Sequence, residues 1–508
     1  MNVNDRIASM SLGVVGAGAM GRGIAQIAVQ AGIPVLLFDN RTGAAEEAQA
    51  FIQQMLARLG EKGKLTNHQV AAASELVHLA ATLEELAPCG VVIEAIIEDL
   101  EVKSTLFQSL EAIVAPDCLL ATNTSSLSVT AIAAACRNPE RVGGFHFFNP
   151  VPLMKVVEVI DGFMTAPWVS ETLTALARRM GHTPVRAKDT PGFIVNHAGR
   201  GYVTEAFRLL GESVAEFHQI DRILRDAAGF RMGPFELMDL TGLDVTHRVI
   251  ESIYHQYYQE PRYRPSPLAQ QRVTAGVLGR KTGRGFYRYE GQQAEAVAVE
   301  PPPAERPGKV WVHCQCPKTY ETLIGLVEKL GGQLDRESRP AAVSLCLVAP
   351  LGLDATAAAL AEGLDPTRTL AIDPLLGFDN HRTLMATPVT DAQVCRQGQG
   401  LFGADGVPVT LLHDSTGFVA QRVLATIVNI TCDMAQQQVA TPADIDRAVT
   451  LGLGYPKGPL AFGDALGPAR VLTILQNIFL LSGDPRYRPS PWLRRRAQLQ
   501  VSLLTEEN

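Results

Sequence analysis

The stretch "GVVGAGAMGRGIAQ" (Gly13–Gln26) decides the fold, because it joins a short apolar run to a helical pattern through a glycine-rich loop. Gly16, Gly18 and Gly21 form a GxGxxG pattern, which indicates a dinucleotide-binding loop when a strand precedes it and a helix follows. Gly16 permits the tight turn, Gly18 lets the backbone approach a pyrophosphate, and Gly21 allows close helix–strand packing. Free N–H groups at the start of the helix then attract the phosphates.

The predicted cofactor loop also includes Ala19 and Met20, and the side chain expected to select the cofactor is Asp39. Asp39 ends the next apolar run, 18 residues past Gly21, where a carboxylate can accept hydrogen bonds from a ribose 2′-hydroxyl. Its charge would repel a 2′-phosphate, although Arg41 could soften this repulsion. We therefore expect NAD as the cofactor and keep NADP as the alternative.

Four short apolar runs alternate with helical patterns in the first part of the chain. This βαβ order predicts an α/β Rossmann-like domain over residues 8–187, with a mostly parallel sheet that ends in an antiparallel hairpin. The four runs are "MSLGVVG" (Met10–Gly16), "PVLLFDN" (Pro34–Asn40), "VVIEA" (Val91–Ala95) and "CLLATN" (Cys118–Asn123).

The predicted hairpin "GGFHFFNPVPLMKVVEVI" (Gly143–Ile160) carries the candidate chemistry. If its two apolar runs pair as antiparallel strands about Pro152, then His146 and Glu158 face each other on one side of the ladder. An imidazole can take a hydroxyl proton while hydride leaves the same carbon, and an opposed carboxylate fixes its tautomer and supports the imidazolium. Beside a dinucleotide loop, this pair indicates a dehydrogenase site.

A helical unit occurs twice in the chain. "KDTPGFIVNHAGRGYVTEAFRLL" begins at Lys188, "HDSTGFVAQRVLATIVNITCDMA" begins at His413, and both show apolar residues at three- and four-residue spacing. The motif "PRYRPSP" also recurs, at Pro261–Pro267 and Pro485–Pro491. We predict all-α domains over residues 188–289 and 411–500.

Between the two helical domains, we predict a Pro-rich linker over residues 290–309 and a reduced α/β segment without a phosphate loop over residues 310–410. The second copy has Gln421 where the first has Asn196, and it lacks the "HFFNP" motif and the spaced glutamate. We therefore expect the second copy to be inactive and to pack on the first helical copy within the chain.

Composition narrows the class of protein. A formal charge of −7 over 508 residues argues against a nucleic-acid binder, and no stretch reaches the length of a membrane span. The eight scattered cysteines and an N-terminal segment without a signal-peptide pattern favour a soluble protein of the cytoplasm. Cys314 and Cys316 lack a second ligand pair, so no metal is expected.

Five motifs in order make residues 10–290 resemble the L-3-hydroxyacyl-CoA dehydrogenase family: "GAGAMGRGIAQ", "EAIIEDLEVK", "TNTSSLS", "HFFNPVPLMKVVEV" and "DTPGFIVN". The duplicated helical domain is similar to the longer bacterial members, including the 3-hydroxyadipyl-CoA dehydrogenases of phenylacetate breakdown. The resemblance implies reversible NAD-dependent oxidation of an L-3-hydroxyacyl-CoA to the 3-ketoacyl-CoA, a step of the β-oxidation type. Because single-copy members dimerise through the helical domain, the paired copies are expected to imitate that dimer, and a further homodimer stays open.

The resemblance also implies roles for the residues that match its motifs. These are His146 as catalytic base, Glu158 as its partner, Ser125 and Asn196 as residues that position substrate, Glu98 and Lys103 as residues that contact cofactor or substrate, and Asn149 near the nicotinamide.

The sequence leaves the substrate open. A dicarboxylic acyl chain would need a cation, for which Arg137, Arg200 and Arg231 are candidates, and Lys62 and Lys64 are weak candidates for contacts with CoA. The chain length could equally be that of hydroxybutyryl-CoA. Two alternatives are an NAD-dependent dehydrogenase of a free hydroxy acid, resembling a gulonate enzyme, and a non-enzymatic, crystallin-like dinucleotide-binding protein.

Overall fold

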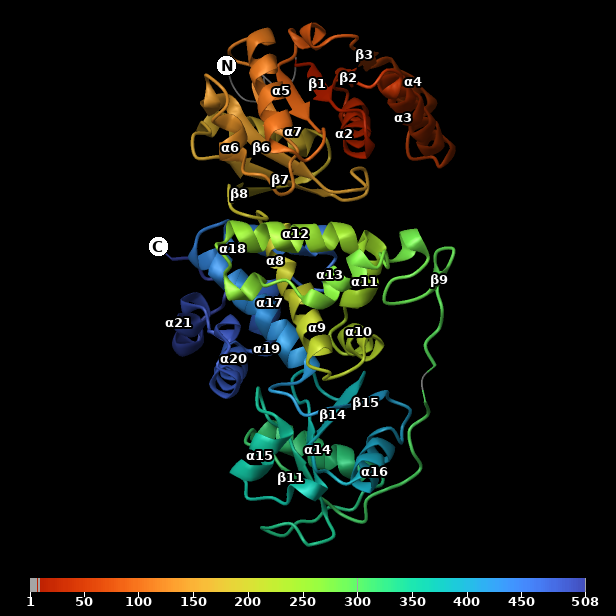
Figure 1. Cartoon of the computed structure of the whole chain (residues 1–508), viewed down its shortest axis with the longest axis vertical. Helices are drawn as coiled ribbons and strands as arrows, with labels where there is room; N and C mark the ends of the chain where they lie inside the picture. The colour runs from red at the N-terminus through yellow and green to blue at the C-terminus, as the bar shows by residue number, and fades with distance from the viewer. Residues whose placement is uncertain (1–6, 8–9, 299, 508) are drawn as a thin grey trace. The chain divides into compact units, whose positions relative to one another are not determined.

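The computed structural model describes residue 7 and residues 10–298 and 300–507. The predicted domain start at residue 8, most of the N-terminal segment and one linker position, Val299, lie outside these described residues. The chain divides into two compact units (Figure 1). The first unit comprises Met1–His197 and Gln437–Leu453, and the second comprises Ala198–Gln436 and Gly454–Asn508.

An eight-stranded sheet forms the centre of the first unit, in the order β3-β2-β1-β4-β5-β6-β7-β8. Neighbouring strands are parallel except for β6 and β7, so the predicted sheet with its antiparallel hairpin is confirmed. One further strand, β8, follows the hairpin and pairs in parallel with β7, because helix α7 (Pro167–Arg179) carries the chain back across the sheet. The strands are β1 (Leu12–Val15), β2 (Val35–Phe38), β3 (Val77–Leu79), β4 (Val91–Glu94), β5 (Leu119–Thr122), β6 (Val142–Phe147), β7 (Val156–Asp161) and β8 (Thr183–Lys188).

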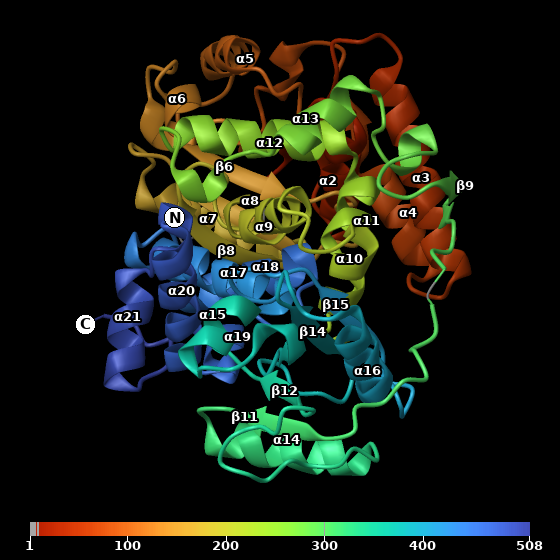
Figure 2. The same cartoon turned by 60° about the horizontal axis from the view of Figure 1, so that its bottom comes forward.

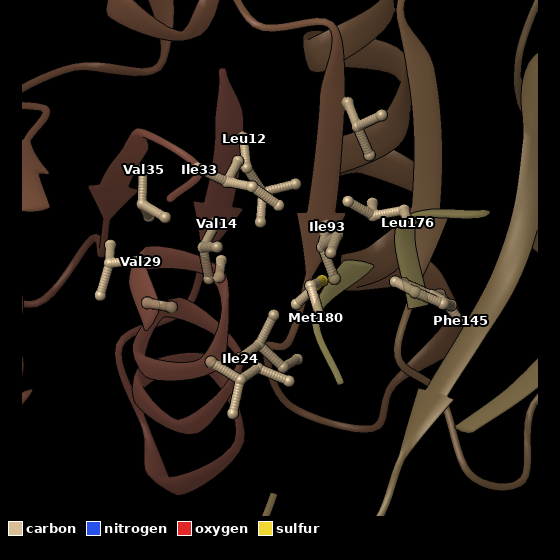
Figure 3. Packing of buried hydrophobic residues seen from close by; sticks show 14 of the residues in the cluster. Leu12, Val14, Ile24, Val29, Ile33, Val35, Ile93, Phe145, Leu176 and Met180 are labelled. Carbon is tan, nitrogen blue, oxygen red and sulfur yellow. The ribbon is translucent and has the colours of Figure 1, made fainter. Parts of the chain in front are cut away.

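Helices cover this sheet, and their apolar faces fill the core between helix and strand. Leu12 and Val14 of β1 and Ile24 of α2 are fully buried and lie in one cluster (Figure 3). Burying each such side chain contributes roughly 1.5–3 kcal/mol, which anchors the loop that joins β1 to α2. The other helices of the unit include α2 (Ala19–Gln30), α3 (Ala44–Glu61), α4 (Asn67–Glu75), α5 (Leu100–Ile113), α6 (Val129–Ala133) and α18 (Pro442–Leu453).

Helix α18 comes from the second helical copy, yet it belongs to the first unit, where it packs against β7 and β8. Thr441 caps its N-terminus through a hydrogen bond from the Asp444 N–H (3.1 Å), and Pro442 is its first residue, as the sequence predicts. Nothing in the sequence indicates that this helix leaves the rest of its copy.

The second unit contains the remaining helices of both copies. Helices α9 and α17 lie side by side (Figure 1), and a Cβ atom on Gly201 would come within 3.1 Å of the Ile427 Cα atom. The predicted pairing of the two helical copies within one chain is therefore present. The helices are α9 (Arg200–Gly211), α10 (Phe217–Asp226), α11 (Pro234–Thr241), α12 (Leu243–Gln256), α13 (Pro267–Thr274), α17 (Val419–Gln436), α19 (Pro459–Leu466), α20 (Pro468–Ser482) and α21 (Pro491–Leu499), and the short α8 (Val195–Ala198) precedes α9.

The second unit also holds the predicted reduced α/β segment as a five-stranded sheet, in the order β11-β12-β13-β14-β15. Only β13 and β14 are antiparallel, so the sheet repeats the pattern of β4 to β8 in the first unit. Helix α14 lies beside β11 (Figure 2). The elements are β11 (Val310–His313), α14 (Pro317–Lys329), β12 (Leu345–Val348), α15 (Ala355–Ala361), β13 (Thr369–Ile372), β14 (Arg382–Ala386), α16 (Ala392–Phe402) and β15 (Val409–Leu412).

The start of the predicted linker is not fully extended, because β9 (Tyr289–Glu290) and β10 (Gln293–Ala294) form a short antiparallel pair. Within the described residues, no single helix is long and apolar enough to cross a membrane. Helices α19 and α20 reach that length and composition only as a pair, joined across a bend of 92°.

Candidate active site

The glycine-rich loop has the close contacts expected of a dinucleotide cradle. Gly16 has φ 101°, and a Cβ atom there would lie 2.6 Å from the Ala95 carbonyl oxygen. A Cβ atom on Gly21 would lie 1.7 Å from the Gly16 carbonyl oxygen, so helix α2 can approach β1 only without a side chain. Gly18 faces open space and is exposed, as is the neighbouring Ala19. This leaves room for a pyrophosphate at the N-terminus of α2.

Asp39 is held at the edge of this cradle. Its Oδ2 atom accepts a hydrogen bond from the Ala17 N–H (2.7 Å) and its Oδ1 atom one from the Arg41 N–H (2.9 Å). The Arg41 guanidinium forms an ion pair with Glu47 at 2.7 Å. Because Arg41 is engaged by Glu47, it does little to offset the charge that Asp39 presents to a 2′-phosphate.

A cavity of about 540 Å³ adjoins Gly16 and Asp39, which is large enough for the adenosine part of a dinucleotide. The residues of the cradle thus fit NAD. The other residues that line the cavity are Val15, Phe38, Asn40, Leu83, Ile96, Glu101, Val102, Thr105, Leu106 and Ser109.

The hairpin brings His146 and Glu158 together as predicted. They are register partners on β6 and β7, and the His146 Nδ1 atom lies 2.6 Å from Glu158 Oε2. Both side chains are buried, with exposed fractions of 4% and 0%. The ring centroids of Phe148 and Phe193 lie 4.4 and 5.9 Å from that of the imidazole. The histidine is therefore flanked by apolar rings.

The second oxygen of Glu158 explains why the carboxylate can be buried. Its Oε1 atom accepts hydrogen bonds from the N–H groups of Ile194 and Val195, each at 2.9 Å. A carboxylate that accepts two backbone hydrogen bonds is stabilised as the anion. Glu158 therefore accepts a hydrogen bond from the His146 Nδ1–H group, which leaves Nε2 as the nitrogen able to take a proton.

Asn196 and Ser125 also meet at this end of the sheet. The Asn196 Nδ2 atom donates to the Ser125 carbonyl oxygen at 3.3 Å, and both side chains are half-buried. Asn149 lies exposed in the turn that follows β6. Ser125 follows β5, Asn149 follows β6, and Asn196 lies in the short helix α8, which the chain reaches after β8.

Glu98 holds the loop that carries Ser125. One of its oxygens accepts hydrogen bonds from the hydroxyl of Thr124 (2.7 Å) and from the N–H groups of Ser125 (2.8 Å) and Ser126 (3.0 Å). Burial favours the neutral acid, but the charge of Lys103 and these hydrogen bonds outweigh it and lower the pKa of Glu98 below its usual value. Glu98 is thus an ionised anchor for the loop.

Lys103 is buried rather than presented at the surface. Its Nζ atom lies 2.5 Å from Glu94 Oε1 and 3.4 Å from Glu98 Oε2. Thr122 donates its hydroxyl hydrogen to the other Glu94 oxygen (2.8 Å). This network ties the ends of β4 and β5 to helix α5, and Glu94 is a member that the sequence analysis missed. The sequence signal that could have identified Glu94 is a charged residue near the end of the apolar run "VVIEA".

Two more positioning residues went unnoticed. Asn123 accepts a hydrogen bond from the Phe147 N–H (2.8 Å), next to His146. Asp189 accepts hydrogen bonds from the N–H groups of Val129 (3.1 Å) and Thr130 (2.7 Å), at the start of α6. Neither residue has a sequence signal beyond its place in a recognised motif.

The candidate cations lie on or beside several different elements of the chain. Lys62 and Lys64 are exposed where α3 ends, and Arg137 is exposed after α6. Arg200 and Arg231 belong to the second unit, where Arg200 is buried and Arg231 exposed. Among the described residues, no group of three or more His, Cys, Asp or Glu side chains is suited to hold a metal ion.

The second copy has the same strand positions with other side chains. Asp373, which follows β13, donates its N–H to the Thr383 carbonyl oxygen (2.9 Å), so this pair stands where His146 and Glu158 stand in the first copy. Gln421 donates an Nε2 hydrogen to Asp373 Oδ1 at 2.9 Å. The expected loss of the histidine–glutamate pair is confirmed.

Comparisons with known proteins cover nearly the whole chain. The family model described as "3-hydroxyacyl-CoA dehydrogenase, NAD binding domain" matches residues 11–190, and the model of the C-terminal domain of the same family matches residues 192–289 and again 417–502. The chain is 39% identical over 491 residues to the 3-hydroxyadipyl-CoA dehydrogenase of Escherichia coli (strain K12), covering 96% of this chain and 98% of that relative.

One further relative matches only the first half of the chain, and one solved structure matches nearly all of it. A probable 3-hydroxybutyryl-CoA dehydrogenase of Deinococcus radiodurans is 41% identical over 280 residues, which is 55% of this chain and 100% of that relative. The crystal structure of a 3-hydroxybutyryl-CoA dehydrogenase from Escherichia coli K12 superposes with a TM-score of 0.83 and 38% identity, covering 96% of this chain and 98% of that one.

Proposed function

Because the chain belongs to the 3-hydroxyacyl-CoA dehydrogenase family, we propose that it oxidises an L-3-hydroxyacyl-CoA with His146 as the base. The reaction class, NAD-dependent oxidation of a 3-hydroxyacyl-CoA, is that of the family. The observation that carries the proposed role is the buried contact of 2.6 Å between His146 Nδ1 and Glu158 Oε2.

The imidazole takes the proton of the substrate hydroxyl on Nε2, since Nδ1 is committed to Glu158. The carboxylate of Glu158 then stabilises the imidazolium, and the N–H groups of Ile194 and Val195 keep that carboxylate in place. When bound, NAD accepts the hydride that leaves the same carbon. A positioned base of this kind contributes about 10²–10⁴-fold to the rate.

Asn196 and Ser125 are proposed to position the 3-oxygen of the substrate, and their contact of 3.3 Å supports a shared role. Glu98 supports them indirectly, because it fixes the backbone of Ser125. Asn149 is proposed to lie near the nicotinamide, and Lys103 acts through Glu94 and Glu98.

The proposed substrate is 3-hydroxyadipyl-CoA, on the basis of similarity along the full length to the relative of that name. Initial rates with NAD and the hydroxybutyryl, hydroxyhexanoyl and hydroxyadipyl thioesters test this assignment, and the highest kcat/KM is expected for hydroxyadipyl-CoA. A preference for hydroxybutyryl-CoA would reject the dicarboxylic substrate but not the reaction. Turnover of the free hydroxy acids at the rate of the thioesters would favour the gulonate-like alternative.

We further propose that the pairing of α9 and α17 replaces a contact between subunits, and that the protein acts in the reducing cytoplasm, where its eight free cysteines stay reduced. The Deinococcus radiodurans relative matches one copy over its whole length, which supports this idea. A fragment of residues 1–295 should then associate or lose solubility. A soluble, monomeric and fully active fragment would contradict the proposal.

A further inference from the structure

A second cavity, of about 580 Å³, lies within the second unit at the carboxyl ends of the parallel strands β11 and β12. Ligands of open α/β sheets bind outside the carboxyl ends of the strands, and this volume is within the usual range of small-molecule sites. The cavity is lined by His313, Cys314, Gln315, Cys316, Thr319, Val348, Ala349, Pro350, Leu351, Leu353, Ala358, Ala361, Glu362, Pro374, Arg470, Thr473 and Asn477.

Arg470 of α20 supplies a positive charge to the wall of this cavity. Its Nη2 atom donates to the carbonyl oxygens of Pro374 (3.1 Å) and Leu375 (3.5 Å), and Nη1 donates to that of Leu466 (3.4 Å). Within the part of the chain that the structure describes, no carboxylate forms an ion pair with Arg470. The carbonyl groups orient the guanidinium. The buried Asp373 interacts with Arg470 electrostatically but forms no ion pair with it among the described residues, so the guanidinium is still suited to an anion.

The rest of the wall has an aliphatic part and a polar part. Leu351, Leu353 and Ala358 give the cavity an aliphatic side. His313 Nε2 and Glu362 Oε1, from the other ionisable side chains on the wall, lie 3.2 Å apart, and the buried Nε2 atom forms no hydrogen bond. A ligand that fits this wall has one negative group and a hydrocarbon body.

In the second copy, the polar side chains at the positions of the first active site form hydrogen bonds with other groups of the protein. Asp373 is buried and accepts hydrogen bonds from Gln421 Nε2 and from the Leu375 N–H, each at 2.9 Å. Gln421 also donates to the Pro350 carbonyl oxygen at 3.1 Å, as Asn196 does to that of Ser125 in the first copy. The second cavity therefore lacks a counterpart of the His146–Glu158 pair. Its lining is suited to binding a ligand and not to proton transfer.

We propose that this cavity binds an aliphatic carboxylate, with its anionic group at Arg470 and its chain along Leu351, Leu353 and Ala358. The site is separate from the proposed dehydrogenase site, which lies in the first unit.

Titration calorimetry of the full-length protein with hexanoate tests the proposal, with hexanamide as a neutral probe and inorganic phosphate as an anion without a chain. Hexanoate is expected to bind at least about tenfold more tightly than either probe, since both the charge and the chain contribute. Phosphate or hexanamide that binds as tightly as hexanoate would overturn the proposal, as would the absence of hexanoate binding.

Variants place the ligand. Arg470→Gln should weaken hexanoate binding at least about tenfold and leave kcat/KM for the acyl-CoA unchanged. Arg494→Gln, which alters an exposed arginine outside the cavity, should leave both unchanged. Equal binding by the Arg470 variant would overturn the proposal.

A second variant does not depend on how the protein tolerates the loss of Arg470. Thr473 is exposed on α20 and lines the cavity, so Thr473→Trp should fill its mouth and abolish hexanoate binding. Alkylation of the exposed Cys316 by iodoacetamide, followed by mass spectrometry, should be slowed severalfold by hexanoate in the wild-type protein. Hexanoate binding that survives in Thr473→Trp, or an alkylation rate that hexanoate leaves unchanged, would overturn the proposal.

Discussion

The first sheet and the second share a framework and differ in chemistry. In the first, Asp189 accepts hydrogen bonds from Val129 and Thr130 at the start of α6. In the second, Asp414 accepts them from Ala355 (2.7 Å) and Thr356 (3.3 Å) at the start of α15. The aspartate that joins loop to helix is therefore present in both copies.

The side chains at the strand ends differ between the copies. His146 and Glu158 form a buried pair of side chains in hydrogen-bond contact, whereas Asp373 and Thr383 contact each other through a backbone hydrogen bond. The comparison teaches that the aspartate which joins loop to helix is kept for the fold, while the side chains of the proposed catalytic pair have changed in the second copy.

The strongest test replaces the proposed base in the first copy and, in a separate variant, its counterpart in the second copy. His146→Gln should lower kcat by about 10²–10⁴-fold, because the base is lost, while NAD binding stays nearly unchanged. Asp373→Asn should leave kcat within about twofold. Steady-state kinetics and NAD titration provide the measurements, and near-normal turnover of His146→Gln would reject its role.

The ion pair between the paired helices α9 and α17 allows a test of stability. The two helical copies do not share this ion pair symmetrically. Arg422 of α17 contacts Glu205 (2.7 Å) and Glu212 (2.6 Å). In the other copy, the residue that matches Arg422 is His197, and the residue that matches Glu205 is Ile430. Arg422→Met should lower the free energy of unfolding by about 3–5 kcal/mol, since the buried Glu205 loses its nearest positive charge and keeps only Tyr487 (2.7 Å) and the more distant Arg486 (4.0 Å).

Urea unfolding measures this effect, and the double variant Arg422→Met with Glu205→Leu is its control. The double variant should recover most of the loss, because the buried charge of Glu205 is removed together with that of Arg422, and Arg486 keeps its contact with Asp484 (4.0 Å). Equal loss in both variants would show that packing of the arginine, and not its charge, stabilises the pair.

The partner of the base gives a smaller effect on the reaction. Glu158→Gln should lower kcat by about 10–100-fold, because an amide stabilises the imidazolium less well than a carboxylate does. The matched change in the second copy, Thr383→Val, should leave kcat unchanged. If Glu158→Gln altered only KM, the carboxylate would not act through His146.

The smallest expected effect concerns the part of the first sheet that the second lacks, strands β1 to β3. Asp39→Ser should raise the NADP-to-NAD ratio of kcat/KM by about tenfold, because the charge that repels a 2′-phosphate is removed. Since Arg41 is paired with Glu47, Glu47→Gln in the same background should raise the ratio further. An unchanged ratio in Asp39→Ser would mean that the carboxylate does not contact the ribose.

Local patterns made the central pair predictable. A strand alternates with period two, so a turn near Pro152 was enough to set His146 opposite Glu158. The anchoring of Glu158 by Ile194 and Val195 was not predictable, because it depends on how the loop after β8 returns to the hairpin.

The same limit applies to the reduced α/β segment. Its strands were recognisable as apolar runs, but its match to β4 through β8 rests on strand order and pairing, which no residue motif records. The place of α18 in the first unit was equally hidden, since its apolar face would suit any neighbour.

That helix has a consequence for how the chain is made. Strand β8 ends at Lys188, whose N–H donates to the Val439 carbonyl oxygen (2.8 Å), and α18 covers β7 and β8. A ribosome that adds about 5–20 residues per second needs on the order of 10–50 s to pass from one segment to the other. During translation the outer edge of the nascent sheet therefore stays bare, and the N-terminal unit reaches its final form only when most of the polypeptide has been synthesised.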